Sequence, residues 1–350
     1  MSASVIAPGL PAARRSFLDS SRWIISRRAD LTWFIGSGFA GYTALGLMWA
    51  GFPILPIYLL WLVAIDGPHV IATVTRTYVD RCERERLGWW LWIIFPFLLV
   101  GPAMAMAGQL ALFYLFAICW QHFHIAKQHF GFMMLWKAKN QERDAAELKL
   151  DRWFMMSTTT LPLAWFVVET RPMINQFVGV QFVMRAALSL YGALAAYYVI
   201  HQIKKWRAGR PMNAPKLMLL GVLAPLQWLA FVYASTFGAE GILRAGITLG
   251  LFHSLQYHRL LWYHNHNRYS DPEAPSRNGL AAVALGKHVG MYLAAAIVLH
   301  FVLMVVPVGL APSTEMAAAT IWGFAFTHYV LDSRIWRVRG NKELAAALRL

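Results

Sequence analysis

The sequence predicts an all-α fold, a polytopic bundle of helices that crosses a membrane. Of the 350 residues, 58% are hydrophobic and only 14% are charged. The mean hydropathy of +0.45 lies outside the usual balance of a soluble globular domain. Runs of about 20 mainly apolar residues, the length that crosses about 30 Å of hydrocarbon as a helix, recur along the chain.

We count ten such runs. The second, fourth and eighth carry polar residues at their ends, and the fifth is short. The chain is therefore expected to divide into a basic cytoplasmic tail at 1–30, one transmembrane domain at 31–336 and a cytoplasmic tail at 337–350. The predicted spans are 31–51, 54–77, 89–107, 110–136, 153–169, 182–203, 216–237, 243–264, 289–310 and 315–335.

Lys and Arg are concentrated in alternate loops, and this pattern predicts the orientation. The tail before the first span contains five arginines, and the segments after the even-numbered spans are also basic. Only Arg171, Arg185 and Arg244 fall on the other side. Because cytoplasmic loops retain positive charge, we expect both termini in the cytoplasm and the chain in the inner (cytoplasmic) membrane.

The net charge of +15 is explained by the same asymmetry. It is expected to mark topology and to contact anionic membrane lipids, so no nucleic-acid partner is expected. Cys82 falls in a predicted cytoplasmic loop and Cys119 in a predicted span. This placement argues against a disulfide between them.

Histidines are concentrated in four predicted spans, all of which run in the same direction. With a rise of about 1.5 Å per residue, His69 and His328 lie roughly 12 Å inside the cytoplasmic ends of their spans, and His129 lies about 10 Å inside. The groups are therefore expected at one level of the membrane. They are His69 in the second span, His122, His124 and His129 in the fourth, His253 and His258 in the eighth, and His328 in the tenth.

Helical geometry prevents all of these side chains from pointing at one site. At about 100° per residue, His122 and His129 share one face, whereas His124 lies on another face with Gln121 and Gln128. The spacing His-x4-His, found in HIAKQH and HSLQYH, needs a kink or a π-bulge to bring both members to one point. The sequence leaves open which histidines bind a metal directly and which support the ligands.

Carboxylates and tyrosines accompany the histidines. Asp66 shares a face with the histidine of the second span, and Asp332 lies one turn beyond that of the tenth. Ionisable groups inside a bilayer normally face the bundle interior, pair, or bind a ligand. Asp332 is a candidate metal ligand or a partner that fixes an imidazole tautomer. Asp66, Tyr257 and Tyr329 are candidate catalytic groups, the tyrosines as donors of a hydrogen bond or proton to the reacting oxygen.

Imidazole and carboxylate ligands suit non-heme iron, copper or zinc, and two cysteines are too few for a thiolate site. We expect iron, as one or two ions, because histidines from several helices can hold it with room for oxygen. Zinc is the alternative.

Three motifs, DGPH, QHFG and a later His-x4-His, resemble the Brp/Blh family of β-carotene 15,15′-dioxygenases. Members of that family are iron-dependent membrane enzymes that cleave a carotenoid to retinal. The resemblance implies His69, His129, His253 and His258 as iron ligands. The chain differs from the family in its larger number of predicted spans, in the segment THYVLDSRIW and in LQYH, where a proline beside the histidine would be expected.

Together, these features predict an integral membrane non-heme iron oxygenase or desaturase that acts on a lipophilic substrate, such as a carotenoid or an acyl lipid. Substrate would enter laterally from the bilayer, and electrons, where needed, would come from a cytoplasmic donor that docks on the basic face. One alternative is a zinc-dependent intramembrane lipid hydrolase. Another is a transporter or a heme-binding electron carrier. The substrate, the number of metal ions, the redox partner and the oligomeric state stay open.

Overall fold

The structure is a computed structural model that describes residues 21–310 and 312–350. Every regular element in this part of the chain is helical, so the predicted all-α fold is confirmed. Residues 1–20 of the predicted N-terminal tail lie outside the described residues.

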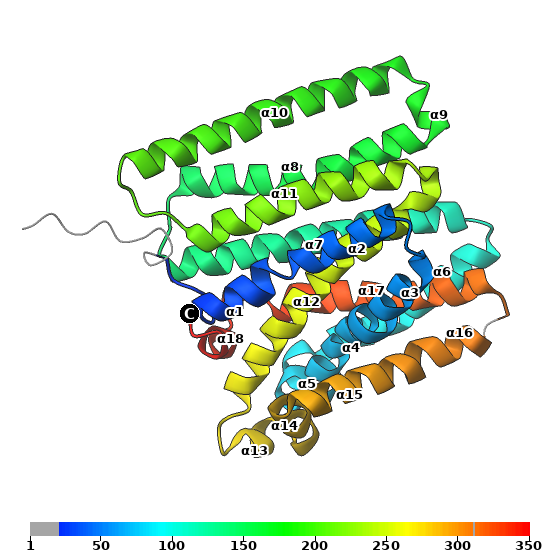
Figure 1. Ribbon diagram of the computed structural model, residues 1–350. Helices are drawn as coiled ribbons and strands as arrows, with labels where there is room; N and C mark the ends of the chain where they lie inside the picture. The colour runs from blue at the N-terminus through cyan, green and yellow to red at the C-terminus, as the bar shows by residue number, and fades with distance from the viewer. Residues whose placement is uncertain (1–20, 311) are drawn as a thin grey trace, which may run out of the picture.

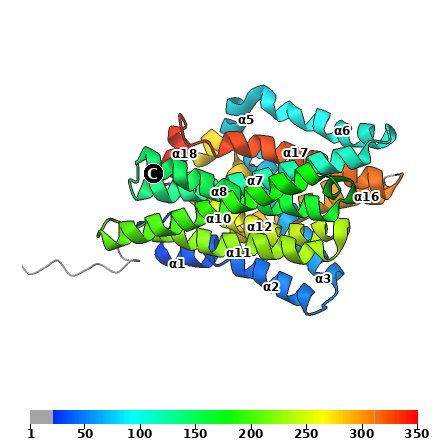
Figure 2. The same cartoon turned by 90° about the horizontal axis from the view of Figure 1, so that it is seen from above.

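The long helices run side by side, and the chain turns back alternately at two opposite ends of the bundle (Figure 1, Figure 2). In the first half of the chain the helices are α1 (Arg27–Ala29), α2 (Gly38–Trp49), α3 (Ile54–Leu59), α4 (Gly67–Val74), α5 (Arg81–Leu87), α6 (Ile94–Met106), α7 (Leu110–Lys139) and α8 (Ala145–Thr170). They are followed by α9 (Pro172–Asn175), α10 (Val178–Arg207), α11 (Ala214–Ser235), α12 (Ile242–Arg268), α13 (Ala274–Asn278), α14 (Leu280–Lys287), α15 (Val289–His300), α16 (Val306–Leu310), α17 (Thr314–Ile335) and α18 (Lys342–Ala347).

Several helices continue directly into segments of wider or tighter winding. The segments Leu60–Asp66 and Thr75–Val79, on either side of α4, are π-helical. Two further π-helical segments are Asp30–Ile35 and Phe301–Val305, and 3₁₀ turns cover Gly88–Ile93 and Gly238–Gly241. A π turn shifts the side chains that follow it around the helix axis, so these segments set the direction in which α4 presents its side chains.

The helices begin where short polar side chains can accept hydrogen bonds from free backbone N–H groups. Asp144 accepts from the backbone of Ala146 at the start of α8. Asn213 caps α11 in the same way, and Ser313 caps α17. Such caps satisfy donors that have no partner within the helix, and they fix where each helix enters the bundle.

Helix α17 packs closely along α6 because glycine lies at two crossing points. A Cβ atom on Gly101 would collide with the backbone of Ala319, and one on Gly323 would collide with the backbone of Phe97. Only glycine therefore permits this approach. The contact holds α17 in place beside α4 and α7.

Helix α12 runs through the middle of the molecule, where it contacts α2, α4, α7 and α11 (Figure 1). The largest apolar core lies between α7, α8, α11 and α12 and includes Phe132, Trp136, Leu223, Phe231 and Phe252. Burial of this apolar surface stabilises the arrangement that brings polar side chains of the same helices together.

Several helices are long and apolar enough to span a membrane. Within residues 21–310 and 312–350, four meet this condition, namely Ile54–Val79, Arg81–Met106, Val178–Arg207 and Ala214–Ser235, and the bent pair Leu280–Lys287 and Val289–Val305 would be a fifth. In the apolar windows of Arg81–Met106 and Val178–Arg207, only 6% of the residues are buried inside the protein. Apolar surface of this kind is compatible with contact to lipid. Helical structure lies over all ten predicted ranges. That all ten are membrane spans stays a prediction.

The described parts of both predicted tails pack against the bundle. The Asp30 carboxylate accepts hydrogen bonds from the backbone N–H of Ile24 at 2.7 Å and from the indole N–H of Trp136 at 2.8 Å. Near the C-terminus, Leu344 and Leu348 are each 1% exposed. The segments 21–30 and 337–350 therefore each contribute buried side chains to the folded bundle.

Candidate metal centre

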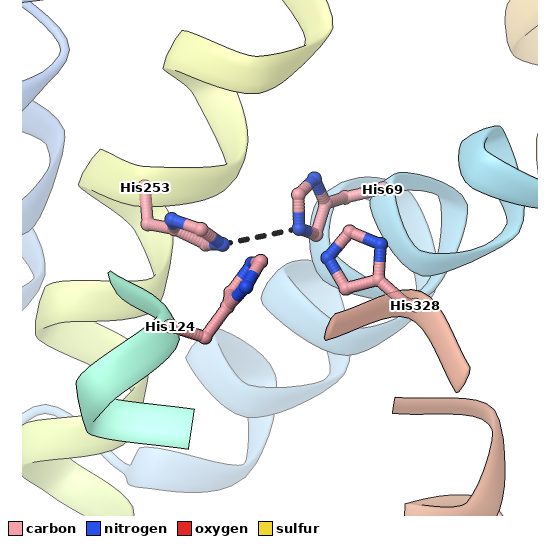
Figure 3. A group of neighbouring side chains, drawn as sticks. All are labelled: His69, His124, His253 and His328. Carbon is pink, nitrogen blue, oxygen red and sulfur yellow. Dashed lines mark hydrogen bonds between the residues drawn. The ribbon is translucent and has the colours of Figure 1, made fainter. Parts of the chain in front are cut away.

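Four histidines from four different helices converge inside the bundle (Figure 3). They are His69 on α4, His124 on α7, His253 on α12 and His328 on α17. Each offers a ring nitrogen, and these four atoms lie within 4.8 Å of one another. We call this group the four-histidine cluster.

The imidazole rings form a closed circuit. Ring centroids are separated by 4.7 Å between His69 and His253 and by 5.0 Å between His253 and His124. The circuit closes through His328, at 4.8 Å from His124 and 4.5 Å from His69. The Nε2 atoms of His69 and His253 are 3.1 Å apart. Two nitrogens bound at about 2.0–2.1 Å to one tetrahedral ion would be roughly 3.3 Å apart, so this spacing suits a shared metal.

Buried nitrogens without partners support the same interpretation. Nδ1 of His69 and His253 and Nε2 of His124 and His328 have no hydrogen-bond partner among the described residues. A buried polar atom without a partner is costly, and it calls for an explanation such as a water or an ion. Nε2 of His124 and His328 are therefore open to a metal, and the Nε2 atoms of His69 and His253, which lie 3.1 Å apart, can join them as ligands. The Nδ1 atoms of His69 and His253 lie on the opposite side of each ring and would not bind the same ion.

A polar network beside the cluster orients His328. The Thr73 hydroxyl donates to Asp332 Oδ1 at 2.9 Å, and its oxygen lies 2.7 Å from His328 Nδ1. Because the one hydroxyl proton is used by Asp332, Thr73 must accept the Nδ1–H of His328. The lone pair of His328 is then on Nε2, the nitrogen available to a metal.

Tyr257 belongs to this network. Its hydroxyl donates to Asp332 Oδ1 at 3.1 Å and lies 2.9 Å from the Thr73 hydroxyl oxygen. Its ring meets the edge of His69, with centroids 4.3 Å apart. Asp332 thus acts through Thr73 and Tyr257, with Oδ1 at 3.6 Å from His328 Nδ1, and it lies outside the group of potential ligand atoms.

The other predicted catalytic residues lie near the cluster in different roles. The Tyr329 ring stacks on His124 with centroids 4.4 Å apart. Asp66 accepts a hydrogen bond from the Ser254 hydroxyl at 2.8 Å and is not among the atoms that meet in the cluster. Tyr329 therefore covers one imidazole, whereas Asp66 ties α12 to the segment before α4.

Two predicted ligands of α7 lie outside the group of converging ring nitrogens. His122 Nε2 is hydrogen-bonded to the backbone carbonyl of Thr159, and the His129 ring packs against Phe252 with centroids 4.8 Å apart. Helix α7 is α-helical from Leu110 to Lys139, with no π turn. Positions 124 and 129 are then about 140° apart around the axis, so only His124 reaches the cluster.

The two predicted ligands of α12 are also five positions apart, so their side chains lie about 140° apart around the helix axis. His258 Nδ1 is 2.7 Å from the Tyr292 hydroxyl, and Nε2 is 2.9 Å from the carbonyl oxygen of Ile65. Tyr292 can donate to Nδ1 while Nε2–H donates to the carbonyl, so neither nitrogen is free for a metal. His258 ties α12 to α15 and to the segment before α4.

Thr73 and Tyr292 are hydrogen-bonded to His328 and His258, and the sequence alone assigned no role to either. Thr73 lies one turn after His69, which places both on one face of α4. That spacing is a usable signal for a supporting residue. No comparable signal exists for Tyr292, because its partner His258 is 34 positions away in sequence.

A second group of potential ligands, Glu142, Glu147 and Asp151, lies where the ends of α7, α8, α10 and α11 meet. Three lysine ammonium groups occupy the space between these carboxylates. Lys216 Nζ is 3.1 Å from Asp151, and Lys205 Nζ is 2.7 Å from Glu147. The charges are already balanced, so this group fits an ion-pair network and not a metal site. Its members are Lys137, Glu142, Glu147, Asp151, Lys205 and Lys216.

Comparison of the chain with protein-family models, curated proteins and solved structures gives no match.

Proposed function

We propose that this chain is an integral membrane oxidoreductase that holds one non-heme iron in the four-histidine cluster and acts on a lipophilic substrate, such as a carotenoid or an acyl lipid. The observation that carries the proposal is the convergence of four histidines, three of them buried and His124 half-buried, whose ring nitrogens lie within 4.8 Å of one another. Bound iron would supply redox chemistry with dioxygen. The resemblance to the Brp/Blh family favours the same chemistry.

The surrounding residues suit such a reaction. Thr73 holds His328 in the tautomer that presents Nε2. Tyr257 and Asp332 share a hydrogen bond at 3.1 Å and can hold a proton beside the cluster. On another side, Tyr329, Trp120 and Phe326 form an aromatic layer that can contact an apolar substrate and exclude water.

The number of histidines favours iron over a zinc hydrolase. Zinc is usually four-coordinate, and a catalytic zinc site keeps one position for water. Four histidine ligands would fill a tetrahedral zinc site completely. Iron accepts six ligands, so two positions remain for reactants. A single ion also accounts for the cluster better than two ions, because the nearby Asp332 is engaged by Thr73 and Tyr257.

The heme alternative has a geometric difficulty. Two axial histidines must lie on opposite faces of a porphyrin, but the rings of the cluster are only 4.5–5.0 Å apart between neighbouring centroids. A porphyrin does not fit between rings at this spacing. A transporter would use the histidines for proton transfer and would not retain iron.

The proposal includes the topology of ten spans in the inner membrane, with both termini in the cytoplasm. Substrate would enter from the lipid, and a cytoplasmic electron donor would dock on the basic end of the bundle. The outward-facing apolar surface of α6 and α10 supports this arrangement.

Metal analysis of the detergent-purified protein tests the proposal. We expect about one iron per chain in the wild type and a large loss in His124→Ala and His253→Ala. Matched controls come from the same helices: His129→Ala and His258→Ala should keep iron, since these side chains lie outside the cluster. Plasma mass spectrometry gives the metal content of all five proteins.

Each result has a clear meaning. Stoichiometric zinc would contradict the proposed oxidoreductase and would favour the zinc-dependent lipid hydrolase instead. A Soret band would indicate heme. Equal iron in the cluster variants and their controls would exclude the four-histidine cluster as the site.

A further inference from the structure

A large basic cavity opens at the end of the bundle where α5, α17 and α18 meet. Its volume is about 730 Å³. Six basic and two acidic side chains line it. The basic residues are Arg86, Arg268, Arg334, Arg337, Arg339 and Lys342, and the acidic residues are Glu83 and Glu343.

The acidic side chains neutralise only two of the basic ones. Arg86 forms an ion pair with Glu83. Arg268 pairs with Glu343 at 2.8 Å and with the buried Asp80 at 3.2 Å. These pairs form one wall of the cavity and leave its other charges uncompensated.

Four cations of the cavity have no carboxylate partner among the described residues. The Arg334 guanidinium lies over the Trp90 ring, 3.9 Å from the centroid. Arg337, Arg339 and Lys342 are exposed side chains, and no hydrogen bond or ion pair joins them to another described residue. A concave site with four uncompensated cations attracts anions strongly.

The chemistry of these side chains selects a phosphate group. A guanidinium is planar and presents paired N–H donors that match two oxygens of a phosphate, and it remains charged at any physiological pH. Three arginines and one lysine are an excess of charge for a single carboxylate. They suit a phosphate mono- or diester that carries a net negative charge.

The surroundings favour a lipid as the carrier of that phosphate. Trp89 and Trp92, on either side of Trp90, are 66% and 69% exposed. Exposed tryptophans collect at the membrane–water boundary, the level at which phospholipid headgroups lie. The adjoining α6 presents further apolar surface, including Phe95 and Leu99, along which acyl chains can pack.

We propose that this cavity binds the phosphate group of an anionic ligand, either an anionic phospholipid headgroup or a soluble phosphate ester. This site goes beyond the proposed metal chemistry, and no residue of the four-histidine cluster contributes to it.

Binding of defined ligands to the full-length protein, as purified in detergent, tests the proposal. The cavity variant is Arg337→Gln, Arg339→Gln and Lys342→Gln combined. The matched control is Arg143→Gln, Lys149→Gln and Arg152→Gln combined, which removes the same charge from exposed positions just before and within the first turns of α8. Native mass spectrometry compares phosphatidylglycerol with zwitterionic phosphatidylcholine, and calorimetry measures glycerol phosphate.

We expect the cavity variant to bind the anionic ligand at least about tenfold more weakly than the wild type, with the control unchanged. Preferential loss of phosphatidylglycerol would assign the phosphate to a lipid, and loss of glycerol phosphate binding would assign it to a soluble ester. Equal binding of both ligands by the cavity variant and the control would overturn the proposal. If the triple variant fails to fold, the single variants Arg337→Gln and Arg339→Gln carry the same comparison.

Discussion

Thr73 is the residue on which the polar groups beside the four-histidine cluster depend. Its hydroxyl contacts His328, Asp332 and Tyr257 within 2.7–2.9 Å. Residues that orient a metal-binding histidine tune metal affinity without binding the metal. Loss of the Thr73 hydroxyl should therefore weaken the affinity of the cluster for metal but should not abolish metal binding.

Replacing Thr73 by valine tests this role. Valine has nearly the same shape but cannot accept the Nδ1–H of His328 or donate to Asp332. We expect metal affinity to fall by about 10–100-fold, measured by competition with a chelator of known affinity. Thr75→Val is the control, since the Thr75 hydroxyl donates only to the backbone carbonyl of Ala72. Equal affinities of the two variants would show that Thr73 does not orient the ligand.

At the scale of elements, the ion-pair network joins the ends of α7, α8, α10 and α11. Lys216 is 1% exposed and lies within 3.2 Å of Glu142, Glu147 and Asp151. Removal of one charge from a buried network leaves the opposite charges uncompensated. Of these helices, α7 carries His124, and α11 packs against α12, which carries His253, so the network stabilises part of the scaffold of the cluster.

Lys216→Met should destabilise the folded protein by about 3–5 kcal/mol. The exposed Lys149 provides the control, because Lys149→Met should change stability by less than about 0.5 kcal/mol. Denaturant unfolding of both variants in the same detergent measures the difference. A loss below about 1 kcal/mol for Lys216→Met would mean that water reaches the network and screens its charges.

The same network predicts a dependence of stability on pH. Burial by itself raises the pKa of Glu142, but the ammonium of Lys216 and the hydrogen bond from Lys205 outweigh burial and lower the pKa below its usual value. A depressed carboxylate pKa contributes stability above the unfolded value, about 4.3 for Glu, and this contribution is lost as pH falls from there toward the folded value. The melting temperature should therefore drop below about pH 4.3, and Glu142→Gln should reduce the drop. Parallel curves for the two proteins would exclude Glu142 as a source.

At the scale of the whole molecule, the chain turns back alternately at two opposite ends of the bundle (Figure 1). The proposed membrane topology depends on this alternation. Helix α10 connects these ends over 30 residues, about 45 Å at 1.5 Å per residue. Arg210 follows its C-terminal end, and Gln176 precedes its N-terminal end. Opposite accessibility of these two positions is the direct consequence of a membrane-crossing α10.

Single cysteines at the two positions test the proposed orientation. In a chain that carries Cys82→Ser and Cys119→Ser, Gln176→Cys should react with an impermeant thiol reagent in spheroplasts, and Arg210→Cys only in inverted vesicles. Both side chains are exposed, so the membrane alone should decide which one reacts. Reaction of both from one side would contradict the proposed topology.

The sequence by itself determined the helical fold and the group of helices that carry the histidines. Apolar runs and their lengths are local properties, and the structure has helices over all of the predicted ranges. The sequence also narrowed the site to side chains on α4, α7, α12 and α17, because the predicted spans over these helices run in one direction and their histidines lie at a similar depth.

Only the tertiary structure decided which member of each histidine pair enters the cluster. His124 and His253 belong to the cluster, whereas the His129 ring packs against Phe252 and His258 is hydrogen-bonded to Tyr292. The rotation of a helix about its axis depends on all of its neighbours, such as the glycine contacts that hold α17 against α6. The network centred on Thr73 joins residues up to 259 positions apart, and distances of that kind in sequence are closed only by the packing of the bundle.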